Sequence, residues 1–205
     1  MPALILLAPV ILMAASGPPD TIDAFGYKWK APIASEWVVE GTGANQVLRM
    51  LVARPSTQPR RPSQYVLAQT PPFEEVTIEA QVKRDKTSLI LVYAWRDENH
   101  FNYAHLSVDS PTKQPVHNGI FHVYGGDRVR ISAESGPGCL PSEDWTPVKL
   151  TWSAKTGEVR VEVNGKEFDN LHGVDLSLGP GLVGLGSFFE TAQFRNVRIH
   201  GVPTR

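Results

Sequence analysis

The chain has 205 residues, and its 20 Lys and Arg against 21 Asp and Glu give a formal net charge of −1. Because the charges are nearly balanced, there is no electrostatic reason to expect a nucleic acid or an anionic membrane as a partner. Apolar residues make up 41% of the chain, with 17 Gly and 17 Pro, as in a globular protein with many turns. We therefore expect one folded domain that does not bind nucleic acid.

An apolar run near the N-terminus is typical of an export signal. It extends from Leu4 to Met13, and the small residues after it fit a signal peptidase site behind Ser16. The run is too short to cross a bilayer, which needs roughly 20 residues. No Lys or Arg precedes it, so a buried N-terminal strand is the alternative. We predict a signal peptide over residues 1–16 and a secreted or periplasmic protein without a membrane span.

Apolar and polar residues alternate along most of the remaining chain. Over residues 75–83, Glu, Thr, Gln and Lys fall on one face and Val, Ile and Ala on the other, which is the pattern of a half-buried strand. Residues 158–163 alternate in the same way, and Asn164-Gly165 after them is a strong hairpin-turn signal. Further strands are expected over residues 37–40, 47–53, 65–69, 89–96, 101–108, 119–124, 129–133, 148–153, 166–168, 182–188 and 192–200.

This spacing of short strands predicts an all-β fold. Turn residues separate the strands, and no crossover helix connects them, as in two antiparallel sheets packed face to face. No internal linker divides the chain. We predict an N-terminal segment over residues 17–35 and one β-sandwich domain over 36–202. The proline-rich stretch 55–62, with Arg54, Arg60 and Arg61, is expected to be an exposed loop.

Four phrases of the sequence resemble a known superfamily. They are residues 93–106 (YAWRDENHFNYAHL), 144–152, 161–166 (VEVNGK) and 181–199. In these phrases the chain resembles the concanavalin A-like lectin/glucanase superfamily, in the branch of laminin-G-like and bacterial 3-keto-disaccharide hydrolase-like domains. The resemblance covers residues 36–202 and implies a jelly-roll sandwich, whose concave sheet binds glycans in many relatives. Within the last phrase, Gly181, Gly184 and Gly186 let a strand lie close to its neighbours.

Aromatic and polar side chains gather between Ser88 and Arg130. We expect Tyr93 and Trp95 on one face of a strand, and Tyr103 and His105 on one face of the next. A ring beside an imidazole suits a sugar, whose C–H face stacks on aromatics while its hydroxyls need directed partners. Ordinary cross-strand packing is the alternative. The predicted ligand-binding residues are Tyr93, Trp95, Tyr103, His105, His117, Asn118, Asp127 and Arg128.

Asp127 and Arg128 follow a Gly-Gly turn. The guanidinium of Arg128 can act as a fork for a sugar carboxylate or a pair of hydroxyls. The alternative is a hairpin corner with a surface salt bridge.

Metal and thiol chemistry find less support in the sequence. Imidazole is a common zinc ligand, which makes His105, His117 and His122 a candidate set, but His117 and His122 are five residues apart and would face opposite ways on one strand. No Asp-rich loop matches a calcium pattern. We predict no cofactor, with a structural calcium ion as the open alternative. Cys139 is the only cysteine, so no intramolecular disulfide forms, and no activating group lies beside it.

Catalysis by paired carboxylates is the competing functional hypothesis. Glycosidases need two carboxyl groups about 5 to 10 Å apart. Glu75 with Glu79, and Glu158 with Glu162, are four residues apart, about 13 Å along a strand, and share their faces with other solvated residues. A pair from two strands, such as Asp97 with Asp127, stays open.

We therefore expect an exported bacterial protein that binds an oligo- or polysaccharide on its concave sheet. A glycan-acting hydrolase or lyase of the 3-keto-disaccharide hydrolase-like type is the first alternative, and an extracellular protein-interaction module is the second. Whether the protein is an enzyme stays open, with binding preferred. If it is an enzyme, we expect a hydrolase that acts on glycosides.

Overall fold

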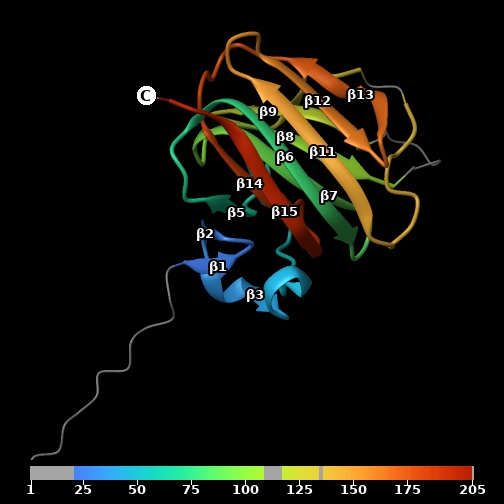
Figure 1. Cartoon of the computed structure of the whole chain (residues 1–205). Coiled ribbons are helices and arrows are strands. Elements are labelled where there is room, and N and C mark those ends of the chain that lie inside the picture. The colour runs from blue at the N-terminus through green and yellow to red at the C-terminus, as the bar shows by residue number, and fades with distance from the viewer. Residues whose placement is uncertain (1–20, 109–116, 134–135, 205) are drawn as a thin grey trace, which may run out of the picture.

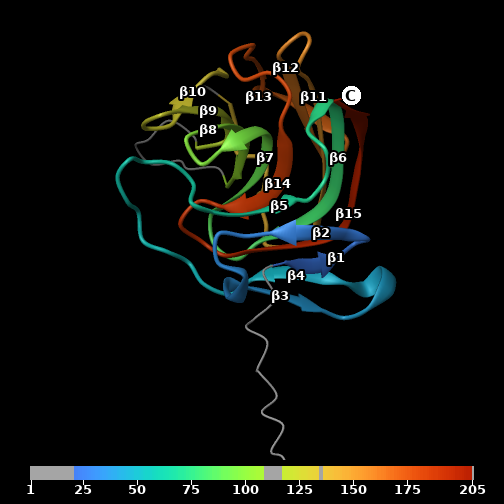
Figure 2. The ribbon, with the colours of Figure 1, turned by 90° about the vertical axis from the view of Figure 1, so that its left-hand side faces the viewer.

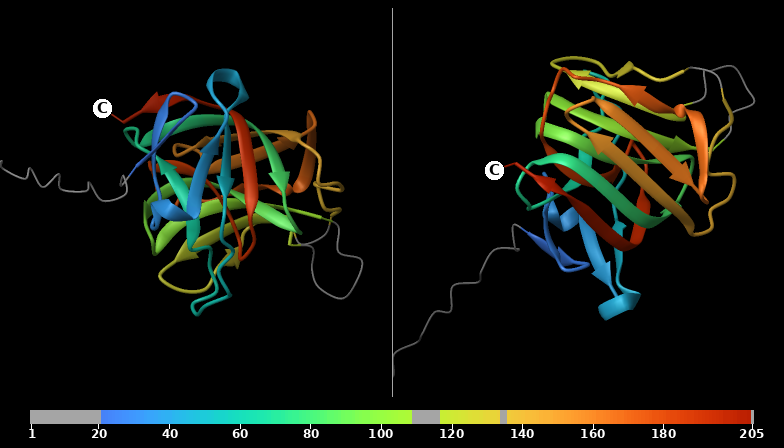
Figure 3. Two further views of the ribbon diagram at one scale, coloured as in Figure 1. Left: turned by 90° about the horizontal axis from the view of Figure 1, so that it is seen from below. Right: turned by 45° about the horizontal axis from the view of Figure 1, so that its top comes forward.

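The protein folds into two antiparallel sheets packed face to face, which confirms the predicted all-β sandwich (Figure 1; the view from below in Figure 3 shows the two layers). The computed structural model describes residues 21–108, 117–133 and 136–204. The predicted signal peptide, 1–16, lies outside these residues. Within them no helix is long and apolar enough to span a membrane, since both helices are single 3-10 turns, η1 (Ala34–Glu36) and η2 (Gly43–Asn45).

The two sheets have eight and seven strands. In spatial order, sheet A contains β1 (Ile22–Ala24), β2 (Tyr27–Lys30), β5 (Gln64–Ala68), β14 (Leu182–Ser187), β7 (Ser88–Asp97), β8 (His100–Ser107), β9 (Gly119–Tyr124) and β10 (Val129–Arg130). Sheet B contains β13 (Lys166–Val174), β12 (Glu158–Val163), β11 (Thr146–Ser153), β6 (Phe73–Arg84), β15 (Ala192–Pro203), β4 (Val47–Met50) and β3 (Trp37–Glu40).

Strands β1 and β2 were not among the predicted strands. They form a hairpin whose turn residues Phe25 and Gly26 both have positive φ, 58° and 81°, and the indole of Trp29 donates to the carbonyl of Ala24 (3.0 Å). Strands of three and four residues are too short to show a period. Because β2 pairs with β5, the sandwich begins before Glu36, the predicted start of the domain.

Sheet A is buried on both faces. Its inner face packs on sheet B in the main core, where the ring of Tyr93 lies 5.6 Å from that of Trp152. Its outer face carries a second apolar cluster, made of Tyr65, Leu67, Ile90, Val92, Phe101, Tyr103, Phe121, Val123 and Phe188, each at most 7% exposed. Most residues of β7 and β8 are accordingly buried on both faces, whereas buried and more exposed residues alternate along β6 and β12.

Segment 51–63 closes part of the outer face of sheet A. It leaves β4 and runs along the sheet A side of the molecule before it enters β5 (Figure 2). Its Arg60 carbonyl accepts the backbone N–H of Arg128 (3.0 Å), and its Arg60 N–H donates to Asp127 (2.6 Å). The segment is exposed over 55–58 as expected, but Pro62 is buried.

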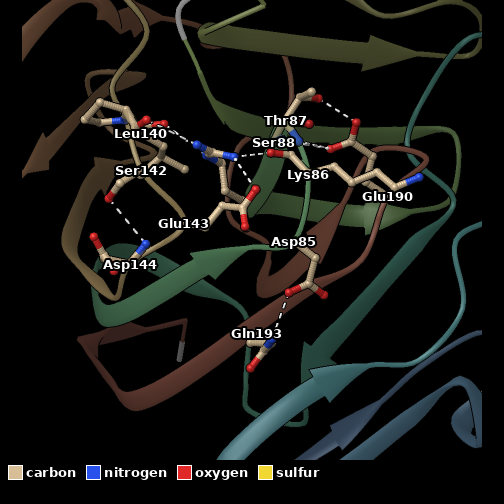
Figure 4. A network of polar contacts seen from close by, with 12 residues as sticks. Asp85, Lys86, Thr87, Ser88, Leu140, Ser142, Glu143, Asp144, Glu190 and Gln193 are labelled. Atoms are coloured by element: carbon tan, nitrogen blue, oxygen red, sulfur yellow. Dashed lines mark hydrogen bonds and ion pairs between the residues drawn. The ribbon is translucent and has the colours of Figure 1, made fainter.

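Polar contacts fix the connections at one end of the sandwich (Figure 4). Arg84, at the end of β6 and only 7% exposed, donates to the carbonyls of Lys86 and Leu140. The carboxylate of Glu190 accepts the backbone N–H of Ser88 (2.8 Å). These bonds satisfy backbone groups where the β6–β7 connection meets two other loops.

A substitution at Gly184 tests how closely β14 packs between β5 and β7. A Cβ on Gly184 would overlap the carbonyl oxygen of Val66. We expect Gly184→Ala to lower the free energy of unfolding by about 1 to 3 kcal/mol, because the sheet must shift. Urea unfolding would measure it. Gly126→Ala is the control, since no heavy atom lies within 4 Å of its Cβ position. Equal stability of both variants would contradict the close packing.

Candidate functional site

The predicted site residues separate onto the two faces of sheet A. Tyr93 is 0% exposed and faces sheet B, whereas Trp95 packs against the second apolar cluster on the outer face. Ala94 between them has a φ of 50°, and the pairing of β7 with β8 shifts register after Tyr93. The expectation that Tyr93 and Trp95 share one face is therefore wrong, because an irregular residue reverses the alternation.

Tyr103, His105, His117 and Arg128 come together on the outer face of sheet A, as a group that we call the Arg128 cluster. The Nη1 group of Arg128 donates to the hydroxyl of Tyr103 and to Nδ1 of His105, both at 3.2 Å. The ring of His117 stacks on that of His105, with centroids 5.9 Å apart. Four of the eight predicted residues thus meet, although they come from β8 and from two loops.

The Arg128 guanidinium contacts two phenyl rings. Its carbon is 4.4 Å from the centroid of Phe121 and 4.3 Å from that of Phe188. Arg130 lies over Phe121 as well, at 4.7 Å. Cation–π contacts with both rings hold the guanidinium in place.

Burial limits what Tyr103 and His105 can offer a ligand. They are 0% and 1% exposed, so neither ring forms an open stacking platform. Burial raises the pKa of Tyr103 to about 12, and burial followed by the charge of Arg128 holds the pKa of His105 well below its usual value. The pKa of half-buried His117 is lowered by the same two causes in the same order. These groups are therefore neutral at neutral pH.

Asn118 has a structural position. Its side chain is fully buried, its Oδ1 accepts the N–H of Ser107 (3.1 Å) and the thiol of Cys139 (2.9 Å), and its Nδ2 donates to Asn170 (3.3 Å). Burial raises the pKa of Cys139 to about 12. The amide of Asn118 is thus occupied by protein groups, as the thiol is.

The candidate zinc set does not assemble. His122 turns away from His105 and His117, and its Nδ1 contacts Asp175 Oδ2 at 2.7 Å and Asn102 Oδ1 at 3.0 Å. Among the residues with a described position, no group of three or more His, Cys, Asp or Glu side chains could hold a metal ion. The hypothesis that these three histidines bind zinc together is therefore wrong.

The outer face of sheet B is hollowed. Two depressions, of about 570 and 450 Å³, lie on it across β12, β11, β6 and β15, the strands nearest the viewer in Figure 1. They take their polar lining from neighbouring cross-strand rows, and we call them together the sheet B trough. Both are open and shallow in character, with polar and apolar groups in their walls.

The larger depression follows one row of side chains. Cross-strand pairing brings into this row Arg160, Thr151, Thr77 and His200. At about 4.8 Å between neighbouring strands, the row spans about 14 Å at the backbone. The two threonine hydroxyls make no hydrogen bond to another described residue and are not among the buried unsatisfied atoms, so they are open to a ligand.

The smaller depression follows the next row, which contains Glu162, Lys149, Glu79 and Arg198. Lys149 donates to Glu162 at 2.8 Å, and this hydrogen bond raises the pKa of Lys149. Opposite charges therefore alternate along the row, which supplies both donors and acceptors for hydrogen bonds.

The sequence analysis did not identify the trough, because the polar residues that line it are the polar half of the alternating pattern that predicts the strands. The polar halves of the alternating strands 75–83 and 158–163 were interpreted as solvated faces, which they are. Which solvated face is hollowed depends on the curvature of four strands together. The sequence shows only that Glu and Thr side chains share these faces.

Glu158, one of the carboxylates that line the trough, does not suit the role of a general acid. Hydrogen bonds from Arg160 and then His172 lower the pKa of Glu158, whereas the general acid of a glycosidase needs a raised pKa. Glu158 therefore suits a hydrogen-bond acceptor better than a proton donor.

Comparison with known proteins places the fold. No protein-family model and no curated protein matches the chain. Among solved structures it is similar to carbohydrate binding module CBM66 from Bacillus subtilis, at 13% identity over 84% of this chain and 95% of that chain, with a TM-score of 0.59. It is also similar to two proteins from Parabacteroides distasonis, each named "putative glycosyl hydrolase". The first has 14% identity and a TM-score of 0.51, and the match covers 85% of this chain and 100% of that chain. The second has 11% identity and a TM-score of 0.53, and the match covers 85% of this chain and 88% of that chain.

At such identities the likeness shows the fold alone. The chain has the β-sandwich found in a carbohydrate-binding module and in glycosyl hydrolase-like proteins, in agreement with the lectin/glucanase-like architecture that the sequence predicts. The laminin-G-like or 3-keto-disaccharide hydrolase-like branch stays a prediction.

The buried imidazole of His105 predicts acid sensitivity. Because the pKa of His105 is lower in the folded protein, the unfolded chain binds more protons below the unfolded-state pKa of about 6.5. The stabilising contribution of the neutral imidazole is therefore complete above that pH. Below it, the free energy of unfolding falls by up to about 1.4 kcal/mol per pH unit for one proton. We expect His105→Gln to flatten this loss between about pH 6.5 and 5 in urea unfolding. The exposed His200 gives the control His200→Gln. Identical slopes in wild type and His105→Gln would refute the assignment.

The raised pKa of Cys139 predicts an unreactive thiol. At pH 8 the thiolate form is scarce and Cys139 is 2% exposed, so we expect an aromatic disulfide reagent to label the native protein at least about 100 times more slowly than the urea-unfolded chain. Rapid labelling under native conditions would contradict the burial of Cys139.

Proposed function

We propose that this protein binds a glycan in the sheet B trough. The observation that carries the proposal is the pair of adjoining hollows lined by two polar rows, Arg160 to His200 and Glu162 to Arg198. Sugar hydroxyls need closely spaced donors and acceptors, and the two rows supply hydroxyl, carboxylate, ammonium, guanidinium and imidazole groups. Because these groups lie on strands of a packed sheet, they are held in place before a ligand arrives.

The size of the trough fits an oligosaccharide. The Arg160 to His200 row spans about 14 Å at the backbone, which is longer than one sugar ring. The open, shallow shape suits an extended ligand that lies across the strands. Its walls combine polar groups for the hydroxyls with apolar groups for the C–H faces of a sugar.

An aromatic ring lies beside the trough. Gln81 and Arg195 form part of the next cross-strand row, and Arg195 donates to Gln81 (2.6 Å) while its guanidinium lies 4.3 Å from the Trp145 ring centroid. Trp145 is partly exposed. The Arg195 guanidinium covers one face of the indole, so a sugar ring would stack on the other face or on the exposed edge of the ring.

The similar solved structures support the proposal at the level of fold, since they include a carbohydrate-binding module. Binding through side-chain hydrogen bonds needs no cofactor or metal ion. Export from a bacterial cell, to the periplasm or beyond, belongs to the same proposal and is supported by the apolar run at residues 4–13.

The double variant Thr77→Val with Thr151→Val tests the trough. Valine keeps the branched shape and removes both hydroxyls, so we expect the dissociation constant of the best glycan found on an array to rise roughly 10- to 30-fold in isothermal titration calorimetry. Lys83→Gln is the matched control, because Lys83 lies on the same face of β6 outside the trough. Unchanged affinity in the double variant, or loss in the control alone, would exclude the trough as the site.

A further inference from the structure

Within the Arg128 cluster, only one nitrogen of the Arg128 guanidinium donates hydrogen bonds to the described residues. A guanidinium has five N–H donors. The two on Nη1 of Arg128 bind Tyr103 and His105, while Nε and Nη2 have no hydrogen-bond partner among the described residues. These remaining nitrogens are not among the buried unsatisfied atoms and Arg128 is partly exposed, so they are open to solvent.

Cationic charge around Arg128 is not balanced by ion pairs. Within the described parts of the chain, neither Arg60 nor Arg128 forms a salt bridge; the arginines that do are Arg49, Arg54, Arg84 and Arg160. The Arg60 guanidinium lies 5.7 Å from the ring centroid of Phe188, the ring on which Arg128 also stacks. Two guanidinium groups therefore meet at the ring of Phe188, and neither is ion-paired with a carboxylate of the described residues. The carboxylate of Asp127, next to Arg128 in the chain, accepts the backbone N–H of Arg60.

The fork is rigid, because three independent contacts fix it. Phe121 and Phe188 both make cation–π contacts with the guanidinium, the Tyr103 hydroxyl and His105 hold its Nη1 group, and the backbone N–H of Arg128 is hydrogen-bonded to the carbonyl of Arg60. A fork held in this way loses little side-chain entropy when it binds an oxyanion. In particular, the two free positions match the two oxygens of a carboxylate.

We infer that Arg128, with Arg60, forms a second binding site, on the opposite outer face from the trough, for the carboxylate of an acidic sugar such as a uronic acid. Phe189 and His117 beside the fork are partly exposed and offer ring surface and a hydrogen-bonding nitrogen for the rest of the sugar. Anion recognition follows from the fork itself. The choice of a sugar as the carrier of the carboxylate rests on the proposed glycan-binding function.

Titration of the isotope-labelled protein with glucuronate, followed by nuclear magnetic resonance, tests the inference, with glucose as the neutral probe. We expect glucuronate to shift the amide signals of Arg60 and Arg128, and Arg128→Gln to weaken its binding at least about tenfold. Arg128→Lys keeps the charge but loses the fork, so its affinity should fall between those of wild type and Arg128→Gln. Circular dichroism checks that each variant folds. If Arg128→Gln does not fold, exposed Arg60→Gln takes its place, with an expected loss of several-fold.

The trough variant separates this site from the proposed function. Glucuronate should bind the double variant Thr77→Val with Thr151→Val as well as it binds wild type. If that variant loses glucuronate while Arg128→Gln keeps it, the acid binds in the trough and the inference is overturned. The inference is also overturned if Arg128→Gln and Arg60→Gln both bind glucuronate with wild-type affinity. The choice of a sugar is overturned if a short glutamate-containing peptide binds the fork as tightly as glucuronate does.

Discussion

The double-sided burial of sheet A is the constraint on which the rest of the molecule depends. Its inner face packs on sheet B, and its outer face carries a second apolar cluster closed in part by segment 51–63 and by the guanidinium of Arg128. A sheet covered on both faces cannot also present a broad polar surface to a ligand. Sheet B is covered on one face only, so its outer face is free to form the trough.

The two outer faces consequently differ in chemistry. In sheet B, unlike charges and hydroxyls alternate across the strands, and pairs such as Lys149 with Glu162 neutralise each other. On sheet A the polar groups are few and mostly buried, and the charge of Arg128 has no carboxylate partner in the described residues. The first arrangement suits hydroxyl-rich ligands that lie flat across several strands. The second suits a single oxyanion.

Most of the strands could be predicted because burial imposes a period of two on a half-covered strand. Residues 119–124 and 158–163 match the predicted bounds of β9 and β12. The hairpin β1–β2 could not be predicted in this way, because its strands have three and four residues and their pairing partner, β5, is more than thirty positions away. Contacts over such distances leave no local pattern.

The sequence by itself determined the class of fold and most of the strands, and its eight predicted binding residues included the four residues of the Arg128 cluster. Only the tertiary structure decided which faces are covered. Alternation tells which side chains share a face, but not whether that face meets solvent, a second sheet or a loop, since that depends on segments distant in sequence. For this reason the sequence could not show that Tyr93 and Tyr103, which were predicted to stack on a sugar, are buried. Thr77 and Thr151, which looked like ordinary solvated residues, line the hollow.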